Sequence, residues 1–234
     1  MITKNINLDL KLSNKVFKPT GTSEILYKST VKQIHKPSKI LDLGCGSGYV
    51  GLSIAKNTTL INQYFFSDLS VEAAKLTKKN SKKNKIKSIV KNGSLFTPWK
   101  NYKFDIIVND VSGISQELNK ISPWYNKYVT NISGKDGTDL TIKFLDESPN
   151  FLENKGFVIF PLISLSNYKK VLNFAKKKFK IVKKLNTKNW PIPKEMYKYE
   201  KKINELCKRK LIFIEKKFGL IIFKTDIYIA KSIK

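Results

Sequence analysis

Short apolar runs alternate with amphipathic stretches along most of the chain. Apolar runs of about four to eight residues between turn residues indicate buried strands, whereas apolar positions three and four residues apart indicate helices. The runs predict strands at residues 38–44, 61–68, 86–93, 103–110, 156–164 and 180–185. The amphipathic stretches predict helices at residues 49–56, 70–83, 139–153 with a bend at Pro149, 167–178 and about 194–208. Strands that alternate with helices in this way predict an α/β protein with a parallel, doubly wound sheet.

The C-terminal stretch has a different pattern, because residues 210–231 contain two apolar runs separated by a turn at Gly219. Two such runs predict an antiparallel hairpin. We therefore expect a seven-stranded, mostly parallel sheet with helices on both faces and this hairpin at its end. The strands near residues 39–43, 62–67, 87–91 and 104–109 are expected to be neighbours, with 156–161 beside the last of them. In such a sheet a ligand binds at the carboxyl ends of the strands.

A glycine-rich loop follows the first predicted strand, in the sequence KILDLGCGSGYVGLSIAK (residues 39–56). Its glycines are Gly44, Gly46, Gly48 and Gly51. Glycines in such a loop let the backbone come close to a ligand. Residues 46–51 match the GxGxxG pattern of dinucleotide-binding loops, which taken alone is a weak signal.

Two acidic residues near this loop bear on the choice of ligand. Asp68 follows the second predicted strand, where a carboxylate binds the ribose hydroxyls of a nucleotide cofactor. Asp42 stands at the loop entrance, and a fixed carboxylate there opposes a pyrophosphate but favours an ammonium or sulfonium group. S-adenosyl-L-methionine carries both of these cations and no phosphate. The pattern therefore favours S-adenosylmethionine, with NAD and a glycine turn without a ligand as the alternatives.

The net charge of +27 suggests an affinity for polyanions. Of the 45 basic residues, however, only Arg209 is an arginine, and the lysines occur in every segment. A lysine excess of this kind has two interpretations, an AT-rich base composition or a surface for nucleic acid. Two cysteines, Cys45 and Cys207, make neither a disulfide framework nor a metal site, and the lone His35 argues against histidine-ligated zinc. Cys45 is expected to fill space in the loop.

No apolar run approaches the roughly 18 residues that a membrane-spanning helix needs. The stretch from Met1 to Leu12 alternates polar and apolar residues and lacks the apolar region of a secretory signal. We therefore expect a cytoplasmic protein with no membrane partner.

The glycine loop resembles the first motif of class I S-adenosylmethionine-dependent methyltransferases, and the resemblance extends over most of the chain. Residues 66–80 resemble the second motif and 90–96 the third. The resemblance implies a Rossmann-like methyltransferase fold, with S-adenosyl-L-methionine as the cofactor. It implies cofactor contacts at Thr20, Asp42, Gly44, Cys45, Gly46, Ser47, Gly48, Asp68, Leu69, Ser94, Leu95 and Asn109. Among these, Asp68 would bind the ribose, and Ser94 and Leu95 would border the adenine.

Within this superfamily the sequence is most similar to the group of release-factor glutamine methyltransferases and amino-group adenine methyltransferases. Residues 16–26 resemble an upstream Pro-Thr turn and helix start that help to hold the methionine end of the cofactor. Residues 104–110, FDIIVND, align with the family's FDLIVSNPPY. Residues 133–160 resemble a segment in which an Asp-Gly-Leu turn opens a helix that leads to the fifth strand.

The sequence departs from this group at residues 109–112, which read Asn-Asp-Val-Ser in place of Asn-Pro-Pro-Tyr. Asn109 is retained, and with Asp110 it is the expected catalytic pair, holding the hydrogens of an acceptor nitrogen. Asp110 either accepts the released proton or caps a following helix. Trp124 and Tyr125 either form an aromatic wall for the acceptor or belong to the core. Residues 190–209 form either a lid or a surface helix.

These observations predict an enzyme that methylates a nitrogen of a protein side chain or of RNA, with a macromolecular substrate as its partner. The alternative is a non-catalytic methyltransferase-fold module that binds nucleic acid through its basic surface. We expect residues 1–36 to be an N-terminal segment that packs on a cofactor-binding catalytic domain at 37–234.

Overall fold

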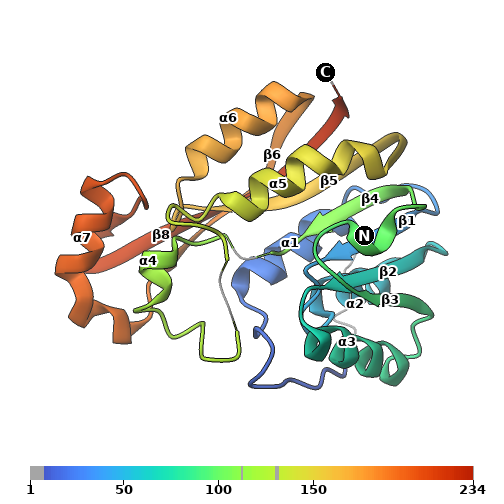
Figure 1. Cartoon of the computed structure of the whole chain (residues 1–234), viewed down its shortest axis with the longest axis horizontal. Coiled ribbons are helices and arrows are strands. Elements are labelled where there is room, and N and C mark those ends of the chain that lie inside the picture. Colours follow the sequence, from blue (N-terminus) through green and yellow to red (C-terminus); the bar gives the residue numbers. More distant parts are fainter. Residues whose placement is uncertain (1–7, 112, 130–131, 234) are drawn as a thin grey trace.

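A computed structural model of the chain describes residues 8–111, 113–129 and 132–233. A single sheet runs through the molecule in the order β3-β2-β1-β4-β5-β8-β6, and a short β7 pairs with β8 (Figure 1). The strands are β1 (Lys39–Leu43), β2 (Gln63–Asp68), β3 (Ser88–Asn92), β4 (Phe104–Asn109), β5 (Leu152–Ile163), β6 (Phe179–Pro191), β7 (Glu215–Lys217) and β8 (Leu220–Ile233). The first five are parallel, and β8 is antiparallel to β5, β6 and β7. The predicted mostly parallel α/β sheet and the neighbours of its first five strands are confirmed.

The helices are α1 (Gly21–Val31), α2 (Tyr49–Lys56), α3 (Val71–Lys83), α4 (Gln116–Asn119), α5 (Asp139–Glu147), α6 (Tyr168–Lys178) and α7 (Glu200–Lys208), with 3-10 turns η1 (Thr97–Trp99), η2 (Ser148–Phe151) and η3 (Lys194–Tyr199). Helices α2, α3, α5, α6 and α7 fall within or close to the ranges that the amphipathic stretches predict, whereas α1 and α4 lie outside those ranges. The predicted bend at Pro149 is the change from α5 to η2. Asn167 caps α6, because its side chain accepts a hydrogen bond from the Lys170 backbone.

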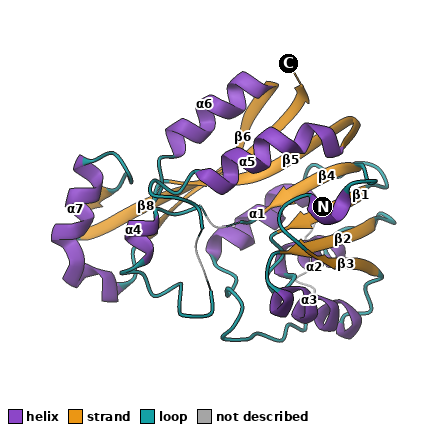
Figure 2. Ribbon diagram, in the orientation of Figure 1, coloured by secondary structure: helices purple, strands orange, loops and turns teal. Residues whose placement is uncertain are grey.

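Helices lie on both faces of the sheet, as Figure 2 shows. A hydrophobic layer of buried side chains lies on each face. Alternate strand residues point to opposite layers. In β2, for example, Phe65 packs with the α5 and α6 layer, and Phe66 packs with α1 and α2. In β4, Ile107 and Val108 divide between the layers in the same way. This period of two fixes the register of the sheet. The carboxyl ends of β1 to β5 lie at one edge because these strands are parallel.

The N-terminal segment at residues 9–11 is bound to α3 by two asparagine side chains. The amide of Asn84 exchanges two hydrogen bonds with the backbone of Asp9, at 3.1 and 2.8 Å. The amide of Asn80 does the same with Lys11, at 2.9 and 3.0 Å. Residues that follow this segment then reach the carboxyl ends of the strands and enter α1 at Thr20, which forms a capping box with Ser23. Of the stretch from Met1 to Leu12, for which no secretory signal was expected, residues 1–7 lie outside the described residues.

The C-terminal strands differ from the expectation in their length. Strand β6 was expected at 180–185 but continues to Pro191, and it pairs with β8 as far as Ile222. The ends of β6 and β8 therefore project beyond β5, whose pairing with β8 stops at Thr225. The predicted terminal hairpin is the short β7–β8 pair, and the main antiparallel partners of β8 are β5 and β6.

A separate hydrophobic cluster forms around the projecting strand ends. It joins α4, η3, α7 and the first residues of β8, and we call residues 188–224 together with α4 the C-terminal lobe. The lobe stands beside the main sheet in Figure 1. Arg209, the one arginine of the chain, donates two hydrogen bonds to Glu117 at 2.9 and 2.7 Å and thereby ties α7 to α4.

Candidate cofactor and acceptor site

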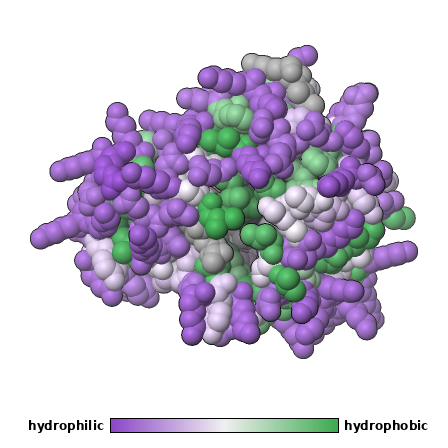
Figure 3. Space-filling model, viewed as in Figure 1, coloured by the Kyte–Doolittle hydropathy of each residue, from purple (hydrophilic) through white to green (hydrophobic). Residues whose placement is uncertain are grey.

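A cavity of about 830 Å³ opens at the carboxyl ends of β1, β2 and β4. Its walls come from the glycine loop, from residues 15–23, and from the end of β6 in the C-terminal lobe. Figure 3 shows the corresponding hollow at the centre of one face, with apolar side chains gathered in it. A cavity of this size at this edge of an open α/β sheet is the expected place for a ligand.

The glycine loop is shaped by positive backbone angles. Gly44, Gly46 and Gly48 have φ of +78°, +55° and +82°, a region that other residues rarely adopt. A Cβ on Gly44 would lie 2.6 Å from Cγ1 of Val111, so the loop and the end of β4 are in close contact. The Gly44 and Cys45 amides both donate to the Ser67 carbonyl, which fixes the loop against β2.

Asp42 lies beneath this loop rather than on the cavity wall. It is 1% exposed, and its Oδ2 accepts a hydrogen bond of 2.8 Å from the Gly51 amide in the first turn of α2. Because Gly48 is the N-cap of α2 and has no side chain, the Asp42 carboxylate takes the place of a cap. Burial, with smaller contributions from the charges of Asp110 and Asp68, raises the pKa of Asp42 to about 8. Its Oδ1 has no hydrogen-bond partner among the described residues.

Asp68 lines the cavity at the end of β2. Its Oδ2 accepts from the Gly46 amide at 2.9 Å and its Oδ1 from the Ser70 amide at 2.8 Å, so the carboxylate is held on both sides. Burial raises the pKa of Asp68, although these two backbone hydrogen bonds act in the opposite direction. Each oxygen keeps a further lone pair that a hydroxyl group can use.

The remaining expected cofactor residues lie around Asp68. Those on the cavity wall are Thr20, Gly44, Cys45, Gly46, Ser47, Leu69, Ser94 and Leu95. The Cys45 thiol is 3.3 Å from the Thr77 hydroxyl, and burial raises its pKa well above the usual range, which fits a space-filling role. Gly48 does not line the cavity and acts instead as the left-handed turn into α2.

The two residues of the expected catalytic pair are placed differently. Asn109 is 1% exposed, its Oδ1 accepts a hydrogen bond of 2.7 Å from the Val111 amide, and it is not part of the cavity wall. This departs from the expectation that Asn109 faces the acceptor, because its amide oxygen is used to close a turn after β4. Ser112, the last residue of the altered motif, lies outside the described residues.

Asp110 does line the cavity. Its Oδ2 accepts a hydrogen bond of 2.6 Å from the Ser23 hydroxyl in the first turn of α1, and burial raises its pKa to about 6. The next described helix, α4, has Ser115 as its N-cap, so Asp110 does not cap a helix that follows it. Its carboxylate is instead held between β4 and the start of α1.

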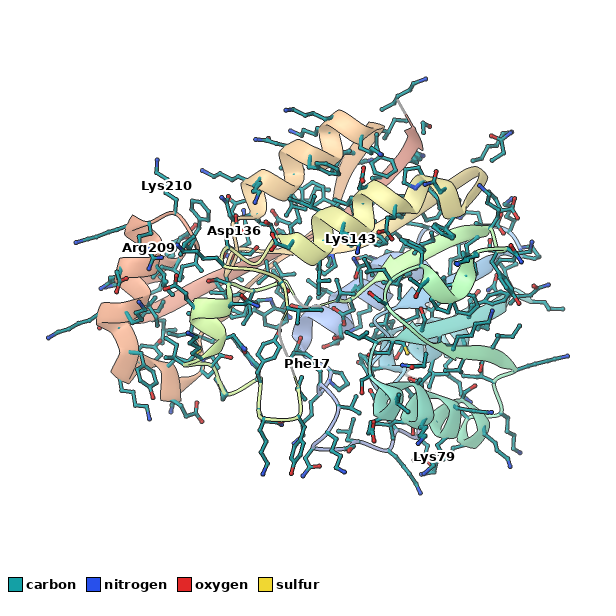
Figure 4. All side chains as sticks on the ribbon, viewed as in Figure 1. Phe17, Lys79, Asp136, Lys143, Arg209 and Lys210 are labelled. Carbon is teal, nitrogen blue, oxygen red and sulfur yellow. The ribbon has the colours of Figure 1, made fainter. Side chains whose placement is uncertain are left out.

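Aromatic rings form the part of the cavity that faces the C-terminal lobe. The rings on the wall are those of Phe17, Trp124, Tyr125, Tyr128, Trp190 and Phe223. Trp124 and Tyr125 were expected either as an acceptor wall or as core residues. Both line the cavity, and both also pack against the lobe cluster. The other four rings were not singled out in the sequence. Phe17 lies between the lobe and the glycine-loop side of the molecule in Figure 4.

Three further observations concern the described residues. They contain no group of three or more His, Cys, Asp and Glu side chains arranged to hold a metal ion. His35, the lone histidine, is exposed. Of the helices in the described ranges, none has the length and apolar character that crossing a bilayer requires.

The sequence matches known proteins in the region that builds this cavity. Residues 18–110 match the family described as the methyltransferase small domain. A release factor glutamine methyltransferase from Borreliella burgdorferi is 32% identical over 162 residues, which cover 66% of this chain and 55% of that protein. A provisionally named protein N5-glutamine methyltransferase from Methanocaldococcus jannaschii is 29% identical over 177 residues, covering 75% and 86% respectively. The chain thus spans about half the length of the first of these relatives.

Solved structures share the fold at low sequence identity. The 16S rRNA N2 G1207 methyltransferase of T. thermophilus, in complex with AdoMet and guanosine, has a TM-score of 0.56 and 14% identity over 92% of this chain and 44% of that one. A ribosomal protein L11 methylase from Lactobacillus delbrueckii subsp. bulgaricus has a TM-score of 0.55 and 15% identity over 95% and 85%. The protein therefore has the Rossmann-like fold of class I methyltransferases, with a mostly parallel sheet and antiparallel C-terminal strands.

Proposed function

We propose that this protein is an S-adenosylmethionine-dependent methyltransferase that methylates a nitrogen atom of a macromolecule. The observation that carries the proposal is the acidic setting of the glycine loop. In a chain of net charge +27, the cavity wall around this loop carries Asp68 and Asp110, and Asp42 lies directly beneath it. Such a site suits a ligand that carries a sulfonium and an ammonium group and opposes one that carries a pyrophosphate.

In this proposal each part of the cofactor has a partner. Asp68 accepts hydrogen bonds from the ribose hydroxyls while the Gly46 and Ser70 amides hold it in place. The adenine lies against Ser94 and Leu95, which line the same end of the cavity. The methionine end lies near Thr20, at the start of α1. Asp42 holds the first turn of α2 through the Gly51 amide and makes no direct contact with the ligand.

The reaction needs alignment more than it needs a nucleophilic side chain. The acceptor nitrogen uses its lone pair to form a bond with the methyl carbon, the carbon–sulfur bond breaks, and the sulfonium becomes a neutral thioether. The nitrogen then carries a positive charge and releases a proton. Asp110 is the group on the cavity wall that can accept this proton, since its pKa of about 6 leaves it ionised at neutral pH.

The proposal does not assign Asn109 a contact with the acceptor through its side chain, because that side chain is buried and occupied. The relatives named for glutamine methylation act on a protein, and the neighbour named for G1207 acts on rRNA. Both are macromolecular acceptors, and the proposal for this chain is stated at that level.

The test is transfer of a tritiated methyl group from S-adenosylmethionine to a lysate of cells that lack this protein, followed by separation into RNA, protein and small molecules. We expect label in a macromolecular fraction with the wild-type protein, and a loss of most of this label with Asp68→Ala. Asp146→Ala is the matched control, because Asp146 is an exposed carboxylate paired with Lys178 on the α5 surface. Label in the small-molecule fraction alone, or none in any fraction, would contradict the proposal.

A further inference from the structure

Four rings in the aromatic part of the cavity form two contacting pairs. Phe17 and Tyr125 pack with their centroids 5.2 Å apart, and Trp124 and Phe223 with theirs 5.8 Å apart. The Trp190 ring covers the backbone of α1 at Gly21, where a Cβ would lie 2.2 Å from the indole. These rings come from separate segments of the chain, yet all of them line one wall. Flat apolar walls of this kind suit a flat acceptor that can stack.

The acceptors beside this wall are not a pair of neutral side-chain oxygens. The Asn109 side-chain oxygen is already bonded to the Val111 amide. Asp110 presents a carboxylate instead, and its Oδ2 is held by Ser23 at 2.6 Å. A carboxylate stabilises the positive charge that the acceptor nitrogen gains on methylation.

The mouth of the cavity carries lysines stacked on the same rings. The Nζ atoms of Lys15 and Lys127 lie 5.9 and 5.0 Å from the centroid of Tyr128, and that of Lys188 lies 4.7 Å from Trp190. Lys194 lines the wall itself. None of the four forms an ion pair with another described residue, whereas Lys83, Lys178 and several other lysines do. The mouth is therefore positive while the floor is negative.

This arrangement distinguishes between classes of acceptor. A basic peptide that brings a lysine amine to Asp110 would be repelled by the mouth and by the net charge of +27. A chain of phosphates would be attracted by both. Sites that bind single-stranded nucleic acid commonly combine aromatic rings with lysines, because the unpaired bases are free to stack on the rings.

We propose that the acceptor is a nitrogen of an unpaired nucleobase in a single-stranded polynucleotide. The base stacks in the aromatic part of the cavity with its edge toward Asp110, and the phosphates on either side lie against the lysines at the mouth. This inference rests on the proposed function, because the methyl donor occupies the glycine-loop side of the same cavity.

The tryptophans provide a direct readout. The chain has three, of which Trp99 is fully buried in the core while Trp124 and Trp190 line the cavity. Oligonucleotides of about twelve residues are titrated into the full chain above roughly 0.2 M salt, where phosphate contacts alone are weak. Parallel titrations with single-stranded RNA and single-stranded DNA show which of the two polynucleotides the protein binds. Duplexes of the same sequences are the reference. We expect fluorescence quenching by a single strand and at least tenfold weaker binding of the duplex.

Two tyrosine variants distinguish binding at the cavity from binding elsewhere on the basic surface. Tyr128 is 50% exposed beneath Lys15 and Lys127, and Tyr199 is 37% exposed beneath Lys198 but does not line the cavity. Because both are on the surface, alanine at either position leaves the core intact. We expect Tyr128→Ala to weaken single-strand binding about five- to a hundredfold, and Tyr199→Ala to leave it within about twofold.

Each outcome decides one question. Equal binding by the two variants, equal binding of single strand and duplex, or binding without quenching would overturn the inference. Calorimetry with S-adenosylmethionine on the same preparation tests the proposed function separately. Cofactor binding together with methyl label in protein rather than in polynucleotide rejects the nucleobase and keeps the methyltransferase, whereas loss of cofactor binding rejects the methyltransferase itself.

Discussion

The glycine-loop side of the cavity and its aromatic side are built in opposite ways. The first is assembled from short segments at the ends of neighbouring strands, with Asp68 held by two backbone amides and Asp42 by one. The second is assembled from residues far apart in the sequence, such as Phe17, Trp124 and Phe223. The first side is acidic, and the second is apolar with lysines at its mouth.

This contrast teaches that the net charge of a chain does not describe its binding site. The excess of 27 positive charges is spread over the surface, while the acidic groups of the cavity lie where the glycine loop brings the backbone closest to a ligand. A cationic cofactor and a polyanionic acceptor are then both favoured, each by its own side of one cavity. Substitutions on the two sides should accordingly have separable effects.

The largest effect is expected from Asp68→Ala on the acidic side. The substitution removes charge-assisted hydrogen bonds to the ribose, worth roughly 1.5–3 kcal/mol, so affinity for S-adenosylmethionine should fall about ten- to a hundredfold. It also frees the Gly46 amide that holds the loop. Calorimetric titration measures the change, and Asp68→Asn, which keeps one acceptor, should lie in between. A dissociation constant equal to that of the wild type would show that Asp68 does not face the ribose.

A pair of glycine variants tests whether the acidic side depends on close packing of the loop. Gly44 and Gly219 have similar φ, +78° and +74°, but a Cβ at Gly44 would meet Val111 at 2.6 Å and one at Gly219 would meet nothing within 4 Å. Each alanine costs about 1–2 kcal/mol in backbone strain. Gly44→Ala should therefore lower the free energy of unfolding, measured with urea, by clearly more than Gly219→Ala, and it alone should weaken cofactor binding. Equal losses in the two variants would contradict the close approach.

Asp110 lines the cavity and predicts how the rate of methyl transfer depends on pH. Burial raises its pKa to about 6 from the ordinary value of 3.8, so the ionised form that can accept a proton is gained as the pH rises through 6. The rate of methyl transfer should rise with pH over this interval and then level off. Asp110→Asn should lower the rate about tenfold or more at pH 7.5 and remove that rise. A variant with the full pH dependence would show that another group accepts the proton.

The smallest effect is expected from Arg209→Lys in the C-terminal lobe. Lysine keeps the charge but loses the two parallel hydrogen bonds to Glu117. Because the pair is partly exposed and far from the glycine loop in sequence, the urea midpoint should fall only slightly, and cofactor affinity should not change. Weaker cofactor binding in this variant would mean that the lobe and the glycine loop are coupled.

The acidic side could be predicted from sequence because its residues are contiguous. Strands β1 to β4 are short apolar runs, and the loop glycines and Asp68 follow directly from the positions of the strand ends. Local pattern and tertiary structure therefore agree there. The expected hairpin turn at Gly219 is also where β7 meets β8.

The aromatic side could not be predicted in the same way. Strand β6 runs through the polar residues Lys183, Lys184 and Asn186, and a register shift follows Lys184, so its extension to Pro191 is set by pairing with β8 rather than by its own pattern. The orientation of Asn109 depends on one hydrogen bond to Val111 that leaves no signature in the sequence. Trp190 reaches the wall only because α1 begins with a glycine at position 21.

The central claim, that the glycine-loop side of the cavity binds S-adenosylmethionine, is tested most directly by calorimetric titration of the full chain with S-adenosylmethionine, S-adenosylhomocysteine and NAD. We predict binding of the first two at one site per chain, strongly weakened by Asp68→Ala, and no binding of NAD, because the acidic side of the cavity opposes a pyrophosphate. Binding of NAD in place of both sulfur compounds, or no binding of S-adenosylmethionine and S-adenosylhomocysteine, would contradict it.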